Sequence, residues 1–187
     1  MQSFLISLFL FLHVMGAIIT FGPTFIFPII ASRAQKNPRH SHFASELSEF
    51  IASRVVLPGA IVQGITGLVL LFLLGVDLTN PAWRWLGIAI VLYLIAIGIS
   101  IGSQGPAARR MVELTAAMSG PPPGVGGAPG APAGGPPAGG PPAGGPPAGG
   151  PPPELIATGK RLQRGGQALG LLVVVIVILM VTKPTIG

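Results

Sequence analysis

Residues 4–31 read FLISLFLFLHVMGAIITFGPTFIFPIIA, and the first charged side chain of the protein follows only at Arg33. A helix crosses the hydrocarbon core of a bilayer, about 30 Å thick, with about 20 apolar residues. The stretch exceeds this length, so it predicts a transmembrane helix that tilts or bends to fit. Pro23 and Pro28 are the expected bending sites, because each removes a backbone hydrogen-bond donor. His13 is the one ionisable side chain within the stretch.

The composition of the chain also indicates a membrane protein. Hydrophobic residues make up 50% of the 187 residues and charged residues only 9%, whereas soluble domains carry about 25% charged residues. The formal net charge of +6 comes from basic residues that flank apolar runs. We therefore expect the lipid bilayer, and not nucleic acid, as the partner of these charges. Cysteine is absent, which excludes disulfides, cysteine-ligated metals and thiol catalysis.

Three further apolar runs follow the first. Together the runs predict an all-α, polytopic membrane protein that forms a bundle of four transmembrane helices. The helices are expected at about residues 3–31, 51–75, 84–104 and 165–182. Residues 1–118 are expected to hold helices one to three of a membrane domain, which residues 154–187 complete with the fourth helix.

The segment 119–153, between helices three and four, is rich in proline, alanine and glycine. The unit Pro-Pro-Ala-Gly-Gly fills residues 136–150 as three consecutive copies, and no residue between Gly120 and Pro153 is charged or aromatic. Such a segment cannot bury enough apolar surface to offset the entropy of ordering it. We therefore expect a disordered cytoplasmic linker that tethers the fourth helix.

The distribution of lysine and arginine predicts the orientation in the membrane. Residues 32–54 carry four basic residues and residues 105–164 carry five, whereas the opposite side has only Arg84 and Lys183. Cytoplasmic segments of membrane proteins are enriched in lysine and arginine. We therefore expect a multi-pass protein of the bacterial cell (inner) membrane, with loops 32–50 and 105–164 in the cytoplasm and both termini outside.

His13 is the leading functional candidate, because ionisable side chains inside a membrane are costly and are usually functional. Helical spacing places His13 on one face with Gly16, Ala17, Thr20 and Thr24. The side chains of this face are small and mildly polar, which favours a position inside the bundle.

Three roles are open for His13. A neutral imidazole can hydrogen-bond across the bundle, for instance to Gln63 or Tyr93. An imidazole can also ligate haem iron or another metal. Because its pKa lies near neutral pH, it can instead handle protons or a polar ligand.

Other polar and small residues complete the set of candidates. The pairs Gly98/Gly102 and Gly166/Gly170 have the spacing of small residues that lets helices approach closely. His40 and His42 lie in the first basic loop, where we interpret them as solvated or facing lipid headgroups. We assign no catalytic residue and no metal site. The intramembrane polar candidates are His13, Thr20, Thr24, Gln63, Thr66, Tyr93 and Ser100.

Three motifs of the first helix carry a family resemblance: LHVMG at residues 12–16, FGPTF at residues 21–25 and FP at residues 27–28. Through them the chain resembles a bacterial family of predicted integral membrane proteins, classed as domain of unknown function 2269. More distantly, the leucine–histidine step resembles the membrane protoporphyrinogen oxidase and copper-resistance-type four-helix bundles. In the former, a first-helix histidine is associated with haem, so this resemblance implies His13 as a ligand of haem b.

These patterns predict an integral membrane protein that is a non-enzymatic packing or assembly subunit. Its partners would be further copies of the chain or other membrane proteins. One alternative is a haem-binding membrane redox protein that uses His13. The other is a small-solute carrier or pore formed by an oligomer. The sequence contains no phosphate-binding loop, nucleophile elbow or HExxH motif.

Overall fold

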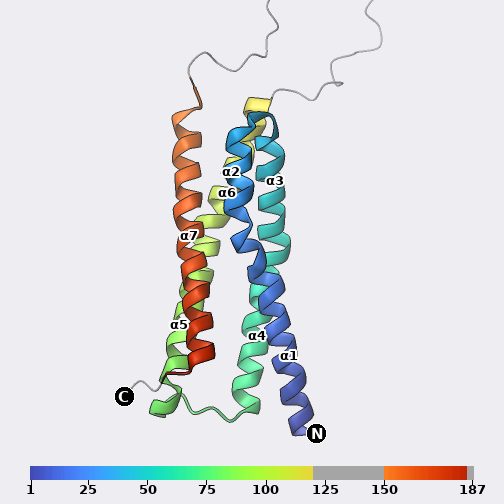
Figure 1. Ribbon diagram of the computed structural model, residues 1–187, viewed down its shortest axis with the longest axis vertical. Coiled ribbons are helices and arrows are strands. Elements are labelled where there is room, and N and C mark those ends of the chain that lie inside the picture. Colours follow the sequence, from blue (N-terminus) through green and yellow to red (C-terminus); the bar gives the residue numbers. More distant parts are fainter. Residues whose placement is uncertain (120–149, 185–187) are drawn as a thin grey trace, which may run out of the picture.

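The computed structural model describes residues 1–119 and 150–184, and within these ranges the chain forms helices and no strand. Four helical segments are long and apolar enough to cross a membrane, and they run side by side (Figure 1). The predicted class of fold, an all-α bundle of four transmembrane helices, is confirmed. Most of the predicted linker falls on residues 120–149, which lie outside the described residues.

Each of the four segments is longer than the sequence predicted, and three of them consist of several helices. The first two segments comprise α1 (Gln2–Phe21), the 3₁₀-helix η1 (Gly22–Phe25), α2 (Phe27–Lys36), the connecting η2 (Pro38–His40), α3 (Ser41–Ile51), the π-helix η3 (Ala52–Val56) and α4 (Leu57–Leu73). The last two comprise η4 (Pro81–Trp83), α5 (Arg84–Ile99), the π-helix η5 (Ser100–Gln104), α6 (Gly105–Ser119) and α7 (Pro153–Thr182).

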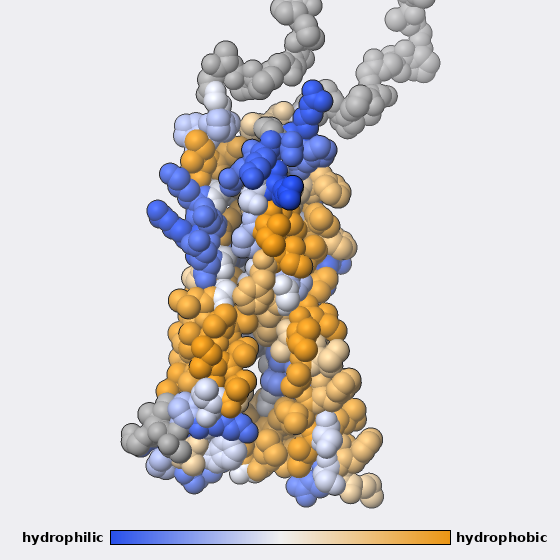
Figure 2. Space-filling view, in the orientation of Figure 1, coloured by the Kyte–Doolittle hydropathy of each residue, from blue (hydrophilic) through white to orange (hydrophobic). Residues whose placement is uncertain are grey.

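The extra length gathers at the upper end of the bundle in Figure 1. The segment Ser41–Leu73 has 33 residues, which span about 50 Å as a helix, so about 20 Å of it extends beyond the hydrocarbon core. We call α2, α3, α6 and residues 153–164 of α7 the helical extension. Figure 2 shows that this part carries most of the hydrophilic surface on the face in view, whereas the lower part is largely hydrophobic.

Prolines explain where the segments change helix type. Pro23 lies in η1 and Pro28 at the start of α2, so the first segment breaks at the two predicted prolines. Both π-helices end shortly before a proline, η3 before Pro58 and η5 before Pro106. A proline ring within a helix clashes with the carbonyl four residues earlier and cannot donate to it. The wider π-turn lets the backbone accommodate that carbonyl.

In the lower half of the bundle the helices associate as two pairs. α1 packs against α4, and α5 packs against α7. In the extension, α3 contacts α6 and α6 contacts α7, which connects the pairs at that end. Figure 2 shows the surface hollowed between the two pairs below this connection. The buried hydrophobic residues are Ala60, Leu70, Trp85, Ala89 and Ala107.

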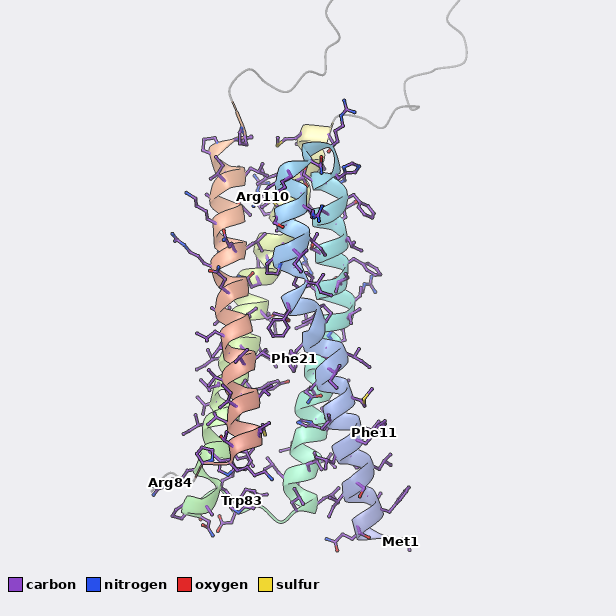
Figure 3. The ribbon with its side chains drawn as sticks, viewed as in Figure 1. Met1, Phe11, Phe21, Trp83, Arg84 and Arg110 are labelled. Carbon is purple, nitrogen blue, oxygen red and sulfur yellow. The ribbon has the colours of Figure 1, made fainter. Side chains whose placement is uncertain are left out.

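The two ends of the bundle are fixed by different contacts. At the lower end, Asn80 Oδ1 accepts a hydrogen bond of 3.0 Å from the Ala82 backbone N–H and so caps η4. In the extension, the Arg110 guanidinium contacts Glu113 of α6 at 2.7 Å and Glu154 of α7 at 2.8 Å. Figure 3 shows these opposite positions through the labelled side chains of Trp83, Arg84 and Arg110.

Candidate functional site, an intramembrane polar seam

The polar candidates of the sequence converge on the contact between α1 and α4. We define the polar seam as His13, Gly16 and Thr20 of α1 together with Gly59, Gln63, Thr66 and Gly67 of α4. The side chains of Thr20, Gln63 and Thr66 are buried, with exposed fractions of 3%, 7% and 8%, and His13 is half-buried. Buried polar groups in a membrane must find partners within the protein. The seam therefore depends on hydrogen bonds between its own members.

His13 is joined to Thr66 and through it to the backbone of α4. The distance from His13 Nδ1 to Thr66 Oγ1 is 2.9 Å, and the Thr66 hydroxyl donates to the Gln63 carbonyl at 3.0 Å. A hydroxyl has one proton to donate, so Thr66 Oγ1 accepts from His13. This network assigns the imidazole proton to Nδ1 and leaves a lone pair on Nε2.

Gln63 of α4 forms a second hydrogen bond to α1. Its side-chain Nε2 donates to the His13 carbonyl at 2.8 Å. Its Oε1 lies 2.8 Å from the position that a Cβ would occupy at Gly16. A larger residue at Gly16 would therefore push the Gln63 amide out of place, so the glycine makes room for this hydrogen bond.

Glycines of α4 let the α1 side chains lie directly on its backbone. A Cβ at Gly59 would overlap Thr20 Oγ1, and a Cβ at Gly67 would lie 3.0 Å from His13 Cε1. A Cβ at Gly59 therefore requires Thr20 to move, and a Cβ at Gly67 would require the His13 ring to shift by a few tenths of an ångström. Small residues at helix contacts in membranes permit this close approach.

Tyr93 of α5 connects the seam to the other helix pair. Its hydroxyl donates to the Ala60 carbonyl of α4. A Cβ at Gly64 would lie 2.9 Å from the same hydroxyl oxygen, so Gly64 provides the space for the ring. In the part of the chain that the structure describes, this is the one hydrogen bond that joins the two pairs at membrane depth.

The structure brings together some of the predicted residues and separates others. His13, Thr20, Gln63 and Thr66 lie in the seam, and Tyr93 lies next to it. Thr24 is half-buried in η1, and Ser100 is half-buried at the start of η5, where its carbonyl accepts the Gly105 N–H. His13 uses Thr66 as its side-chain partner, where the sequence had suggested Gln63 or Tyr93.

Sequence reasoning missed the glycines that shape the seam and favoured others that do not. A Cβ at Gly98, Gly102, Gly166 or Gly170 would meet nothing within 4 Å, so the prediction of close packing at these two pairs within the chain is wrong. The missed signal was the recurrence of small or polar residues along one face of α4. The residues of this face are Gly59, Gln63, Thr66 and Gly67.

The seam offers a single atom that could ligate a metal. Among the described residues, no group of three or more histidine, cysteine, aspartate or glutamate side chains could hold a metal ion. His42 lies in the extension, 3.4 Å from Glu46 and 3.4 Å from Thr115, and His40 is exposed. This atom is Nε2 of His13, which could ligate haem iron through its lone pair.

Comparison with known proteins gives one match. A family described as predicted integral membrane protein (DUF2269) matches residues 7–102, which cover the whole polar seam and Tyr93. No curated protein and no solved structure matches the chain.

Proposed function

The chain belongs to the DUF2269 family of predicted integral membrane proteins, and we propose that it acts as a non-enzymatic subunit that packs or assembles with other membrane proteins. One observation carries this proposal. His13, Thr66 and Gln63, three of the polar residues at membrane depth, form a continuous set of hydrogen bonds between α1 and α4. Polar groups used in this way position helices.

The packing around the seam supports a structural role for His13. Its ring lies against the backbone of Gly67, and its Nδ1 is held by Thr66. Helices in lipid lack a hydrophobic driving force for association, so close packing and interhelical hydrogen bonds must hold them. The seam supplies both at the contact between α1 and α4.

We further propose that the protein lies in the bacterial cell (inner) membrane with the helical extension in the cytoplasm and both termini outside. The asymmetry of nine basic residues against two supports this orientation. A protease added outside intact cells should then leave segment 105–164 uncut. Cleavage of that segment from outside would contradict the orientation.

The function is tested by isolating the full chain from its own membranes in a mild detergent. We expect a stoichiometric assembly with further copies or with another membrane protein. The purified protein should give no conductance and no solute flux in liposomes. A conductance that survives purification would contradict the proposal and favour the alternative of a carrier or pore.

Haem ligation is the second candidate, because the Nδ1 proton assignment leaves the Nε2 lone pair of His13 without a hydrogen-bond partner among the described residues. Thr66 would then orient the ligand, as partners of the other ring nitrogen do in metal sites. The visible spectrum of the protein, expressed with ample haem, decides between the two candidates. Our proposal expects no Soret band, whereas a Soret band that is lost in His13→Ala would establish His13 as the ligand.

A further inference from the structure

The helical extension has an apolar face that neither the bundle nor the bilayer core covers. Phe43, Leu47 and Phe50 of α3 have exposed fractions of 64%, 37% and 58%. Their spacing of four and three residues puts them on one side of the helix. Phe43 lies about 30 residues from Leu73, or about 45 Å along the helix, which is beyond a hydrocarbon core about 30 Å thick. Phe50 lies about 23 residues from Leu73, or about 35 Å, so the face extends outwards from the headgroup region and is open to a protein partner.

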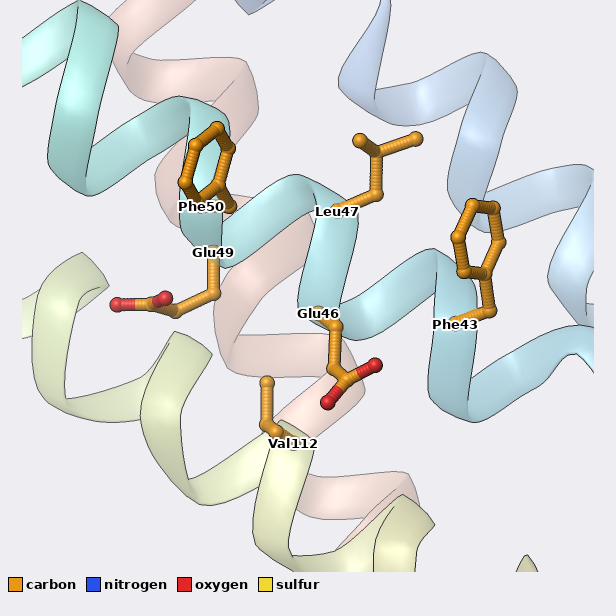
Figure 4. A pocket seen from close by; sticks show the side chains of 6 residues that line it. All are labelled: Phe43, Glu46, Leu47, Glu49, Phe50 and Val112. Atoms are coloured by element: carbon orange, nitrogen blue, oxygen red, sulfur yellow. The ribbon is translucent and has the colours of Figure 1, made fainter.

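A shallow, open groove lies along this part of α3, and Val112 of α6 lines its edge. It has a volume of about 440 Å³. Figure 4 shows Phe43, Leu47 and Phe50 on one side of α3 and the carboxylates of Glu46 and Glu49 on the side towards α6. We call it the α3 groove, and its lining residues are Phe43, Glu46, Leu47, Glu49, Phe50 and Val112.

The two carboxylates of the α3 groove are weakly engaged within the chain. Glu46 lies 3.4 Å from His42, and Glu49 lies 3.8 Å from Arg109. Both distances are longer than those of strong charge-assisted hydrogen bonds. An apolar wall beside two such carboxylates suits long cationic side chains, whose stems cover apolar surface while their heads reach the acids.

The opposite side of the bundle presents side chains of this kind. Lys160 and Arg164 of α7 are exposed, one helical turn apart, and make no ion pair with the other described residues. Ile156, one turn further up, is 45% exposed. Figure 1 shows α7 and α3 on opposite sides of the bundle, with their upper parts at a similar height.

We propose that a second copy of the chain occupies the α3 groove with residues 153–164 of its α7. Lys160 of one copy faces Glu46 of the next, and Arg164 faces Glu49. Glu46 and Glu49 are three residues apart, or about 4.5 Å along α3, and Lys160 and Arg164 are four residues apart, or about 6 Å along α7. Because these two spacings are similar, both ion pairs can form at once. Both helices run in the same direction relative to the bundle, so the copies keep the same orientation in the membrane.

The two faces differ from each other, so the contact is heterologous. Such a contact closes into a ring or continues as a row, depending on the angle between copies. This inference rests on the proposed assembly function and names its partner, a further copy of the chain.

Cysteine cross-linking tests the contact cleanly, because the natural chain has no cysteine. Two full-length variants with different tags, Phe43→Cys and Ile156→Cys, are co-expressed and treated in membranes with a short bis-maleimide. We expect a cross-link that carries both tags. The matched control replaces Ile156→Cys by Val181→Cys, at the lower end of α7, and should give no mixed product with Phe43→Cys.

Charge reversal identifies the ion pairs without altering the cross-linking positions. Added to both tagged chains, Glu46→Lys with Glu49→Lys should lower the cross-linked fraction about tenfold, and so should Lys160→Glu with Arg164→Glu. All four changes together should restore it. Circular dichroism and the elution volume in detergent show that each variant is folded.

Absence of the mixed product, or failure of the fourfold variant to restore it, would overturn the inference. Cross-links between two Phe43→Cys chains alone would also overturn it, because they indicate a symmetric contact of α3 with α3. If the chain does not associate with itself but co-purifies with another membrane protein, this inference fails and the proposed function stands. If the copies cross-link as expected but conduct solutes, the proposed function fails instead.

Discussion

The pairs α1/α4 and α5/α7 lie in the same apolar bundle but are held by different means. Between α1 and α4, polar side chains hydrogen-bond to the partner helix and lie directly on glycine backbone. Between α5 and α7, the described residues make no hydrogen bond, and a Cβ at Gly98 or Gly170 would meet nothing within 4 Å. The seam thus fixes one pair at membrane depth, whereas the close glycine contact of α7 lies above α5, where a Cβ at Gly165 would overlap the Gln104 side chain of η5.

The α5/α7 pair has its fixed point outside the membrane. Arg110 of α6 binds Glu154 of α7 at 2.8 Å, and Arg161 Nε lies 3.4 Å from Ser103 Oγ at the start of the extension. Since apolar helices gain little from leaving lipid for one another, we infer that the extension sets the position of α7. We therefore expect substitutions in the seam to lower the free energy of unfolding more than equivalent substitutions on α5 or α7.

The largest effect is expected from Gly59→Leu. The new side chain would overlap Thr20 and force α1 away from α4, which should lower the free energy of unfolding by about 2–3 kcal/mol. Titration of the purified protein in mixed micelles, followed by circular dichroism, measures it. The matched control is Gly170→Leu, which enters open space and should change the value by less than about 0.5 kcal/mol. Equal effects at both sites would contradict the comparison.

A smaller effect is expected from Tyr93→Phe. The substitution removes the hydroxyl that donates to the Ala60 carbonyl and leaves the ring in place. Hydrogen bonds between membrane helices contribute about 0.6 kcal/mol on average, so the same titration should show a loss of about this size. Spin labels on α4 and α5 should also report a wider spread of distances. An unchanged distribution would remove Tyr93 as the connection between the pairs.

The smallest effect on stability is expected from a substitution in the loop between α4 and η4. The Thr79 hydroxyl, 2.7 Å from Asp77 Oδ1, and the Thr79 backbone N–H at 2.9 Å lower the pKa of Asp77 below its usual value. A lowered pKa stabilises the folded state above the ordinary pKa of aspartate, and this is lost as the pH falls through the lowered pKa. Thr79→Ala should therefore raise the pKa of Asp77, as NMR titration can measure, and lower the stability at neutral pH only slightly, because the Asp77 carboxylate is exposed to solvent. A large loss of stability at neutral pH would show that the loop does more than connect.

The sequence predicts the bundle well, because membrane thickness and apolar length are local properties. The run before Arg33 and its two prolines suffice for the first segment and its break. The sequence predicts that the second and fourth helices begin outside the membrane, near Glu46 and Glu154, but it did not predict that the first and third segments continue as helices to Lys36 and Ser119. Residues 105–119 have the charge of a loop but form α6, which packs against α3 and α7 and pairs Arg110 with Glu113 and Glu154.

The polar seam was predicted only in part, because it depends on which helices become neighbours. Helical spacing grouped His13 with Thr20, but nothing local to α1 indicates that α4 lies against it. The pairing also decides which glycines matter. Gly59 and Gly67 face α1. Gly98 and Gly102, which are four residues apart as in close-packed membrane helices, face open space.

The role that we assign to His13 is that of a packing group bonded to Thr66. A double-mutant cycle with His13→Ala and Thr66→Val in the micelle titration measures their coupling directly, because effects that each substitution has alone cancel. We predict a coupling free energy of about 0.6 kcal/mol, the average for hydrogen bonds between membrane helices. Additive effects of the two substitutions would contradict the claim.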